Sequence, residues 1–268
     1  MHGRDGFAHV NGTQLYYEIA GEGPPLVLIH GFGLDRRMWE AQMAAFTPAY
    51  QVLRYDLRGF GRSALPGVDR YTHYEDLQAL LAYLHIERAH ILGLSLGGGI
   101  AVDFALAYPS MTDHLILAAA SALNGYVWPD ELAGWFAGFA EAAYSGDMAL
   151  AKERWLHCGW FVPAQRQPAV TAQLRQLVAD YSGWHFRHKN PVRGLHPPAN
   201  ERLAEIGAPT LVIVGEQDLP FYNHPLADHL AAHIPNAQKV VMPGIGHMVN
   251  MEDPACFNEI VLTFLHKN

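Results

Sequence analysis

The chain has 268 residues, of which 50% are hydrophobic and 16% are charged, and this balance suits one large α/β domain with a sizeable core. Its formal net charge of −8 argues against nucleic acid and anionic membrane surfaces as partners. The two cysteines, Cys158 and Cys256, lie far apart, which argues against a disulfide framework and against a zinc knuckle. Because no apolar leader and no membrane-spanning run is apparent, we expect a cytoplasmic protein. We also expect a monomer or a homodimer.

Strand and helix signals alternate from the start of the chain to residue 122. Asn11-Gly12 separates two β-rich runs and predicts a hairpin. Continuous apolar runs, such as 26–29 and 89–92, are typical of strands buried on both faces of a sheet. Thr72, followed three residues later by Glu75, is a capping-box pattern that predicts a helix start. The expected strands are 7–10, 14–19, 26–29, 51–55, 89–92 and 112–119, and the expected helices are 36–46, the one opened by Thr72, and 98–108.

The segment 123–198 differs from the rest of the chain, because strand runs vanish and five of the six tryptophans lie here. Aromatic residues follow helical spacing between prolines. We therefore expect a helical cap inserted between two parts of the core, 1–122 and 199–268. Most of its aromatic side chains should form the cap's own small core. The candidates for lining an apolar substrate pocket are Trp128, Trp160, Trp184 and His185 in the cap, and Met248 beyond it.

The remaining signals complete an α/β pattern, with strands expected at 209–214 and 238–242 and helices at 227–233 and 253–265. Alternating strands and helices predict a doubly wound, mostly parallel sheet, and the expected strands number eight. In such sheets functional residues gather at the carboxyl ends of the strands. His30, Ser95, Asp218 and His247 each follow an expected strand, so they can converge although they are far apart in the sequence.

The stretch Gly93-Leu94-Ser95-Leu96-Gly97 stands between an expected strand and an expected helix. That is the context in which G-x-S-x-G forms a nucleophile elbow. The serine occupies a strained backbone conformation, and its neighbours two residues before and after come too close to other atoms to carry a Cβ. Ser95 is therefore the candidate nucleophile.

A serine hydroxyl needs a base to take its proton, and histidine has a suitable pKa. His247, in a glycine-rich loop after the last expected strand, is the candidate base. A carboxylate must orient the imidazole, and Asp218 follows the preceding strand. Glu216 is the alternative acid at this strand end.

Three other patterns have simpler explanations than a second site. Asp103 on the elbow helix is expected to be buried or paired structurally. His229 and His233 have a spacing that could bind a metal, but no acidic third ligand accompanies them, so we expect a solvated helix face and no metal. The run 97–99 lacks the ending of a phosphate-binding loop.

With these residues in place, the chain resembles proteins of the α/β-hydrolase fold, in the lid-bearing group of esterases, lactonases and C–C hydrolases. The motifs that carry the resemblance are His30-Gly31-Phe32-Gly33, Asp56-Leu57-Arg58-Gly59-Phe60-Gly61-Arg62-Ser63, Gly93-Leu94-Ser95-Leu96-Gly97-Gly98, Gly215-Glu216-Gln217-Asp218 and Gly246-His247. The resemblance implies that the backbone N–H groups of Phe32 and Leu96 form an oxyanion hole. It also implies structural roles for His30 and for the stretch 56–63. A serine at the elbow argues against the dehalogenases and epoxide hydrolases of this fold, which use aspartate.

The resulting hypothesis is a serine hydrolase that cleaves a small carboxylic ester or lactone through an acyl-enzyme, without cofactor or metal. A second hypothesis keeps the triad but cleaves C–C bonds of diketone acids, or performs perhydrolysis or elimination. A carboxylate substrate of that kind needs a basic residue near the cap, and the candidates are Arg154, Arg175, Arg187, Lys189 and Arg193. A third is a non-catalytic receptor that binds a small ligand beneath the cap.

Overall fold

The computed structural model describes residues 3–267, and its centre is a single eight-stranded sheet with the strand order β1-β2-β4-β3-β5-β6-β7-β8. The strands are β1 (Arg4–Val10), β2 (Thr13–Ala20), β3 (Pro25–Ile29), β4 (Gln51–Tyr55), β5 (Ala89–Leu94), β6 (Thr112–Ala118), β7 (Thr210–Gly215) and β8 (Ala237–Met242). Strands β1 and β2 pair antiparallel, as do β2 and β4, and every later pairing is parallel. The expected mostly parallel sheet is therefore confirmed.

The hairpin at Asn11-Gly12 forms as expected. Both residues have positive φ, 48° and 67°, which is the conformation that a two-residue turn between twisted strands requires. The central strands β3, β5 and β7 are buried almost throughout, which explains their continuous apolar sequences.

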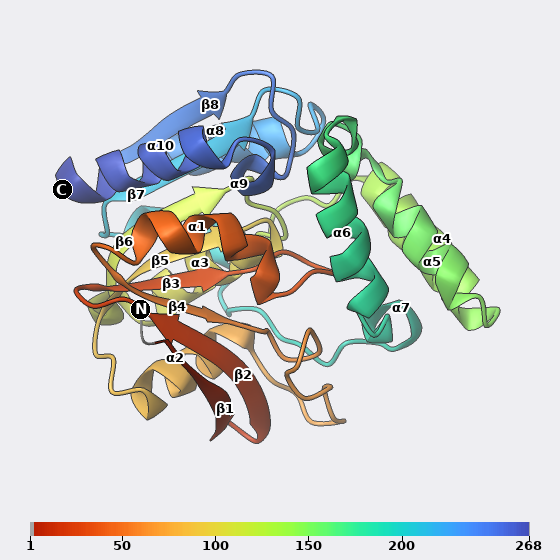
Figure 1. Cartoon of the computed structure of the whole chain (residues 1–268), viewed down its shortest axis with the longest axis horizontal. Helices are drawn as coiled ribbons and strands as arrows, with labels where there is room; N and C mark the ends of the chain where they lie inside the picture. The colour runs from red at the N-terminus through yellow and green to blue at the C-terminus, as the bar shows by residue number, and fades with distance from the viewer. Residues whose placement is uncertain (1–2, 268) are drawn as a thin grey trace.

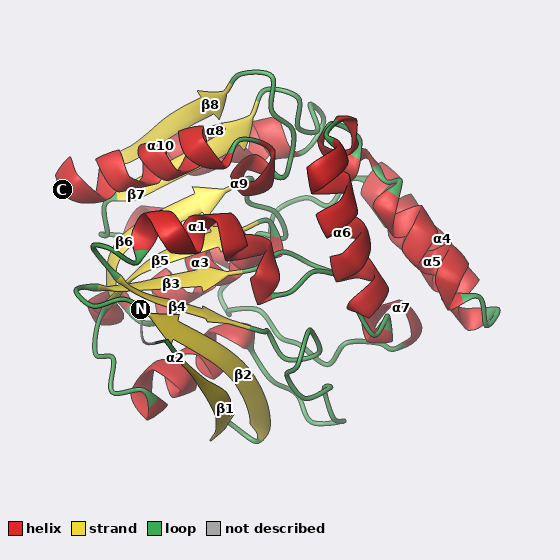
Figure 2. Cartoon of the chain, viewed as in Figure 1, coloured by secondary structure: helices red, strands yellow, loops and turns green. Residues whose placement is uncertain are grey.

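Helices cover both faces of the sheet (Figures 1 and 2). On the nearer face in Figure 1, α1 (Glu40–Phe46) packs against α10 (Pro254–Lys267). On the other face lie α2 (His73–Tyr83), α3 (Leu96–Ala107) and α8 (Asn223–His233). The short helix α9 (Val249–Glu252) precedes α10. Some starts differ from expectation. Strand β1 begins at Arg4 and not at residue 7, α3 begins at Leu96 and not at residue 98, and α8 begins at Asn223 and not at residue 227. The segment expected as one helix from residue 36 opens as the 3₁₀ helix η1 (Arg36–Trp39).

Between β6 and β7 the chain is helical and lies beyond the carboxyl ends of the parallel strands (Figures 1 and 2). It comprises α4 (Asp130–Tyr144), α5 (Met148–Leu156), α6 (Pro168–Asp180) and α7 (Trp184–Arg187), with short 3₁₀ turns at Gly159–Phe161, Ala164–Arg166, Ala199–Glu201 and Leu203–Glu205. Helix α6 contacts η1, and Arg37 Nη1 of η1 lies 2.8 Å from Asp180 Oδ2. This segment is thus anchored on the core near the carboxyl ends of the parallel strands, where ligands bind in sheets of this kind.

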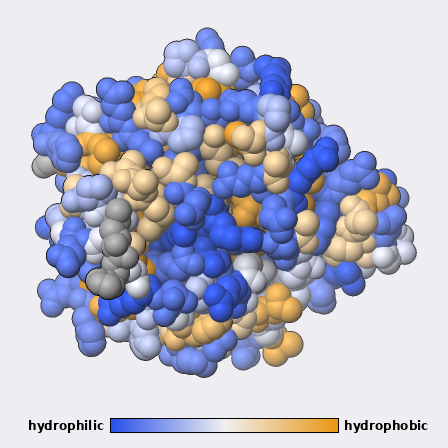
Figure 3. Space-filling view, in the orientation of Figure 1, coloured by the Kyte–Doolittle hydropathy of each residue, from blue (hydrophilic) through white to orange (hydrophobic). Residues whose placement is uncertain are grey.

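The molecular surface seen in Figure 3 is mostly hydrophilic, with hydrophobic residues scattered between polar ones. Within residues 3–267, no helix has both the length and the apolar character needed to cross a bilayer.

Candidate active site

Ser95 joins β5 to α3 in a strained conformation, with φ of 55° and ψ of −116°. A non-glycine residue takes such angles only where the surrounding structure enforces them, and such strain gathers at functional sites. The two flanking glycines explain how the turn closes. A Cβ on Gly93 would overlap the backbone carbonyl of Gly97, and a Cβ on Gly97 would overlap the carbonyl oxygen of Ile29. Ser95 is therefore raised at the carboxyl edge of the central strand.

Asp218 and His247 form a buried pair at the same edge of the sheet. His247 Nδ1 lies 2.8 Å from Asp218 Oδ2, and the two side chains are 4% and 0% exposed. A carboxylate only accepts hydrogen bonds, so Nδ1 carries the hydrogen and Nε2 is left as the basic nitrogen. The other carboxylate oxygen, Oδ1, accepts the N–H of Leu219 at 2.7 Å. Both oxygens are thereby held, which fixes the orientation of the imidazole. Glu216 instead accepts the N–H of Gly244 at an exposed position, so the structure pairs Asp218 with the histidine.

Ser95 and His247 line one small pocket of about 10 Å³, together with Phe32, Trp160 and Met248. Among the described residues no hydrogen bond joins the hydroxyl of Ser95 to the imidazole. Catalytic hydrogen bonds are often long before substrate binds, so this geometry is compatible with proton transfer in a complex.

The backbone N–H groups of Phe32 and Leu96 are available for a ligand, since neither donates to an acceptor within residues 3–267. Leu96 is the first residue of α3, where N–H groups point out of the helix without an intrahelical partner. The positive end of the helix dipole adds to their attraction for an anion.

Glu252 secures the loop that carries His247, and sequence reasoning missed it. Its buried carboxylate accepts the N–H of Gly246 at 2.9 Å and the N–H of Met248 at 3.0 Å, on either side of the histidine. Burial raises the pKa of this carboxyl above its ordinary value. A glutamate shortly after a glycine-rich loop was the available signal, but it is a common pattern and does not reveal which N–H groups the side chain will meet.

The aromatic candidates separate into two groups. Trp160 lies with its ring 5.5 Å from that of His247, and its Nε1 donates to Asn223 Oδ1 at 2.9 Å. Trp128 is 37% exposed and lies outside the Ser95 pocket, with its ring 6.5 Å from that of Trp160 and tilted by 52°. Trp184 stacks on the ring of the exposed His188, also outside that pocket.

His30 supports the loop beside the site. Its Nε2 accepts the N–H of Leu57 at 2.9 Å, so Nδ1 carries the hydrogen and donates to the carbonyl oxygen of Gly31 at 2.8 Å. Burial lowers the pKa of His30. Asp56 lies beneath this loop, where it accepts the backbone N–H groups of Arg36 and Arg62 at 2.9 and 2.8 Å.

A larger cavity of about 310 Å³ adjoins the Ser95 pocket and shares Phe32 with it. Leu96, Asp103, His73 on α2 and His185 on α7 all line it. Asp103 was expected to be buried or structurally paired. It is largely buried, and its Oδ1 has no hydrogen-bond partner among the described residues.

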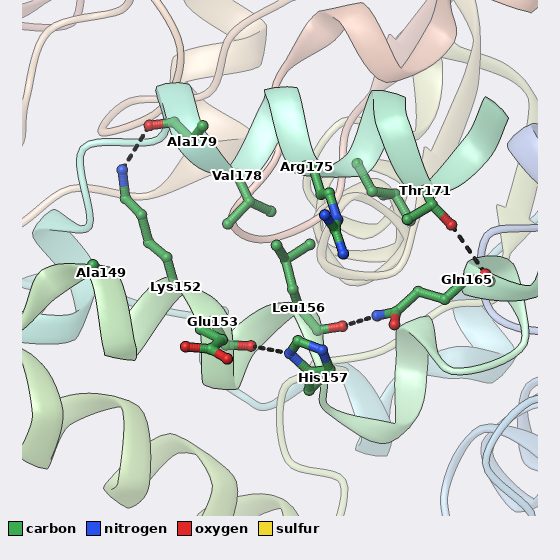
Figure 4. A pocket seen from close by; sticks show the side chains of 11 residues that line it. Ala149, Lys152, Glu153, Leu156, His157, Gln165, Thr171, Arg175, Val178 and Ala179 are labelled. Carbon is green, nitrogen blue, oxygen red and sulfur yellow. Dashed lines mark hydrogen bonds between the residues drawn. The ribbon is translucent and has the colours of Figure 1, made fainter. Parts of the chain in front are cut away.

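Another pocket lies in the segment between β6 and β7, away from Ser95. Its volume is about 420 Å³, and it is formed by α5 and α6 of the insertion (Figure 4). Figure 4 shows Lys152, His157 and Arg175 around it, with Lys152 bonded to the carbonyl oxygen of Ala179. Of the residues singled out in the sequence, Arg175 lines this pocket, whereas Ser95, Asp218 and His247 do not.

The imidazoles of His229 and His233 both take part in hydrogen bonds within the protein. His229 Nε2 lies 2.7 Å from Asn200 Oδ1, and His233 Nδ1 lies 2.8 Å from the carbonyl oxygen of His229. Over the part of the chain that the structure describes, no group of three or more metal-ligating side chains gathers.

Comparison with known proteins places this geometry in a family. Residues 24–254 match the alpha/beta hydrolase fold family, and the chain belongs to it. The chain is 33% identical to the dihydrolipoyllysine-residue acetyltransferase component of the acetoin cleaving system of Pseudomonas putida, covering 97% of this chain and 69% of that protein. It is 30% identical to the pimeloyl-(acyl-carrier protein) methyl ester esterase of Aeromonas hydrophila, over 92% of this chain and 98% of that protein.

Among solved structures, the enol-lactonase from Burkholderia xenovorans LB400 superposes with a TM-score of 0.81 at 30% identity, covering 97% of this chain and 100% of that one. The expected family and fold are confirmed. The names of these relatives refer to different reactions. Family membership therefore defines a hydrolase-type scaffold, and the substrate must be inferred from the residues of the site.

Proposed function

We propose that the protein is a serine hydrolase that cleaves a small carboxylic ester or lactone. The observation that carries the proposal is the buried 2.8 Å hydrogen bond between Asp218 and His247, because this histidine lines the same pocket as the strained Ser95. The esterase and lactonase named among the relatives support this class of substrate.

In the proposed reaction, the basic Nε2 of His247 takes the proton of the Ser95 hydroxyl as its oxygen attacks the substrate carbonyl. Asp218 stabilises the imidazolium that forms. The N–H groups of Phe32 and Leu96 bind the oxyanion of the tetrahedral intermediate, and one such donor contributes about 10²–10³ in rate. The protonated imidazole then gives its proton to the departing alcohol. Water, activated by the same nitrogen, releases the acid from the acyl-enzyme.

The insertion 123–198 acts in this proposal as a cap over the site. Trp160 supplies an apolar wall beside His247, and Met248 adjoins it from the core. Apolar walls exclude water from the carbonyl and strengthen the electrostatic interactions around it.

Cleavage of C–C bonds in diketone acids remains the second candidate, and it requires a cation for the carboxylate. Arg154 contacts the carbonyl oxygen of Gly138, and Arg175 lines the outer pocket of Figure 4. Arg193 lines the cavity beside the Ser95 pocket, and this is the observation that favours the second candidate.

The test is hydrolysis of p-nitrophenyl esters from acetate to decanoate by wild type, Ser95→Ala and Ser110→Ala. Ser110 is an exposed serine outside the site and serves as the matched control. We expect turnover in wild type and Ser110→Ala, and its loss in Ser95→Ala. Turnover that survives in folded Ser95→Ala would remove Ser95 from the mechanism. An absence of turnover by folded wild type on every ester of the series would overturn the ester-hydrolase proposal.

A further inference from the structure

The loops that carry the proposed oxyanion donor and the proposed base follow strands that are far apart in the sheet. The loop 30–33, with the N–H of Phe32, follows β3, whereas the loop 243–248, with His247, follows β8. In the strand order, β5, β6 and β7 lie between β3 and β8. At about 4.8 Å between neighbouring strands, the ends of β3 and β8 lie about 19 Å apart. Both loops nevertheless reach the Ser95 pocket, so the hydrogen bonds of the sheet do not by themselves fix their relative position.

Asn250 connects the second loop to the elements beside the first. It lies on α9, which packs beside α1 and η1 (Figure 1), and its side chain is fully buried. Asn250 Nδ2 donates to the carbonyl oxygen of Met38 at 2.9 Å and to Gln42 Oε1 at 3.2 Å. Gln42, fully buried on α1, donates from Nε2 to the carbonyl oxygen of Asn250 at 2.9 Å. The backbone and the side chain of Asn250 are therefore both held.

Met38 on η1 extends this connection to the loop 30–33. While its carbonyl oxygen accepts Asn250, its Sδ accepts the backbone N–H of Gly31 at 3.3 Å. The carbonyl oxygen of Gly31 accepts His30 Nδ1 at 2.8 Å, so side chains hold both backbone groups of this glycine. The peptide bond between Gly31 and Phe32 is trans and planar. The N–H of Phe32 therefore points away from that carbonyl oxygen, and its direction is fixed.

The side chain of Asn250 contributes less to stability than its burial suggests. Its Oδ1 has no hydrogen-bond partner within residues 3–267. An unpaired buried acceptor is unfavourable, and this offsets part of what the hydrogen bonds of Nδ2 contribute. The residues that line the Ser95 pocket and the adjoining cavity include neither Asn250 nor Gln42, so the pair does not touch a substrate there. What the pair provides is a connection between two loops that the sheet leaves apart.

We propose that Asn250 is a positioning residue, which together with Gln42 fixes the base and the oxyanion donor relative to each other. It does so by connecting the loop 243–248 to the loop 30–33. The inference rests on the proposed function, because that function assigns proton transfer to the first of these loops and oxyanion binding to the second. The pair acts through the two loops and takes no part in bond making.

Hydrogen exchange followed by NMR tests the connection without any turnover. Asn250→Ala removes both hydrogen bonds of Nδ2, so we expect the amide of Gly31 and those of residues 246–248 to exchange about 10-fold faster. Thr210→Val is the matched control, because it removes a hydrogen bond of a buried side chain at the amino end of β7, away from the site. A wild-type exchange rate at Gly31 in Asn250→Ala overturns the proposal, as does an equal acceleration in Thr210→Val.

Gln42→Met breaks the same connection from α1 with a side chain of similar length. It should also accelerate exchange at Gly31, and the double variant with Asn250→Ala should exchange more slowly than the two separate effects combined predict, since both changes act on one network. Fully additive effects would show that the two amides act independently, which contradicts the proposal. If neither single variant folds, the pair holds the fold and not the site, and the proposal is wrong.

Ester kinetics separate this inference from the proposed function. In Asn250→Ala we expect kcat to fall by about 10- to 100-fold while KM changes by less than about twofold, because the groups that contact the substrate remain. Faster exchange at Gly31 with an unchanged kcat would give the pair a structural role only and overturn the proposal. If wild type turns over no ester and Asn250→Ala still accelerates exchange at Gly31, the ester hydrolase is rejected and the connection between the loops is kept.

Discussion

The carboxylate of Glu252 is the structural support of the His247 loop, and Glu252→Gln tests that role. In the wild type its two oxygens each accept one backbone N–H, from Gly246 and from Met248. A glutamine keeps one acceptor oxygen and turns an NH₂ group toward the second N–H. That N–H is then buried without a partner, which costs about 1–3 kcal/mol.

A second effect acts in the opposite direction. Burial raises the pKa of Glu252, so keeping this carboxyl ionised is costly in the folded state, and the neutral glutamine avoids that cost. We therefore expect the free energy of unfolding to fall by about 1–2 kcal/mol at pH 7, less than the loss of a hydrogen bond to a full charge would suggest.

Activity should respond more strongly than stability. The loop places the imidazole, and a displacement of about 1 Å at a catalytic group can cost on the order of 10²-fold in rate. We expect kcat to fall by about 10- to 100-fold with KM nearly unchanged, because Glu252 lines neither the Ser95 pocket nor the adjoining cavity.

Stability is measured by urea unfolding monitored through tryptophan fluorescence. Ester hydrolysis over a range of substrate concentrations gives kcat and KM separately. Glu259→Gln, an exposed glutamate on α10, is the matched control. If Glu252→Gln behaves as Glu259→Gln does in both assays, the two hydrogen bonds do not position the histidine, and the reasoning is wrong. A fall in stability with an unchanged kcat would make Glu252 a purely structural residue.

Three further changes have expected outcomes. Asp218→Asn should lower kcat by about 10⁴-fold by favouring the wrong imidazole tautomer, whereas Glu216→Gln should change it less than twofold; comparable losses would reassign the acid. Gly97→Ala should destabilise the fold by about 3 kcal/mol or more, since the added Cβ overlaps the carbonyl oxygen of Ile29; a near-normal urea midpoint would contradict the tight elbow. His73 has its pKa lowered to about 3 by burial, so the unfolded chain binds the proton first as pH falls below about 6.5, and wild type loses stability there. His73→Phe removes this loss, so its free energy of unfolding should rise relative to that of wild type by on the order of 2 kcal/mol between pH 7 and pH 5. If the difference in free energy of unfolding between the two proteins is the same at both pH values, this histidine is not held neutral.

The sequence by itself determined the scaffold and the position of the strained serine at the elbow. Hairpin, strands and elbow are encoded within a few neighbouring residues, because turn conformation, apolar runs and the need for glycine around Ser95 depend on backbone sterics and local periodicity. The expected contact between Asp218 and His247 also forms, because the carboxyl ends of parallel strands lie at one edge of the sheet.

Tertiary structure decided everything that depends on which side chains of distant elements meet. Nothing in the local sequence distinguishes Trp160, which lies against His247, from Trp184, which stacks on His188 outside the Ser95 pocket. In the sequence Asp103 is a single acidic residue in an apolar helix. Only the packing of α2, α3 and α7 shows that it lines a cavity. Periodicity reports which face of a helix is buried, but the neighbour that buries it is chosen by the packing of the whole chain.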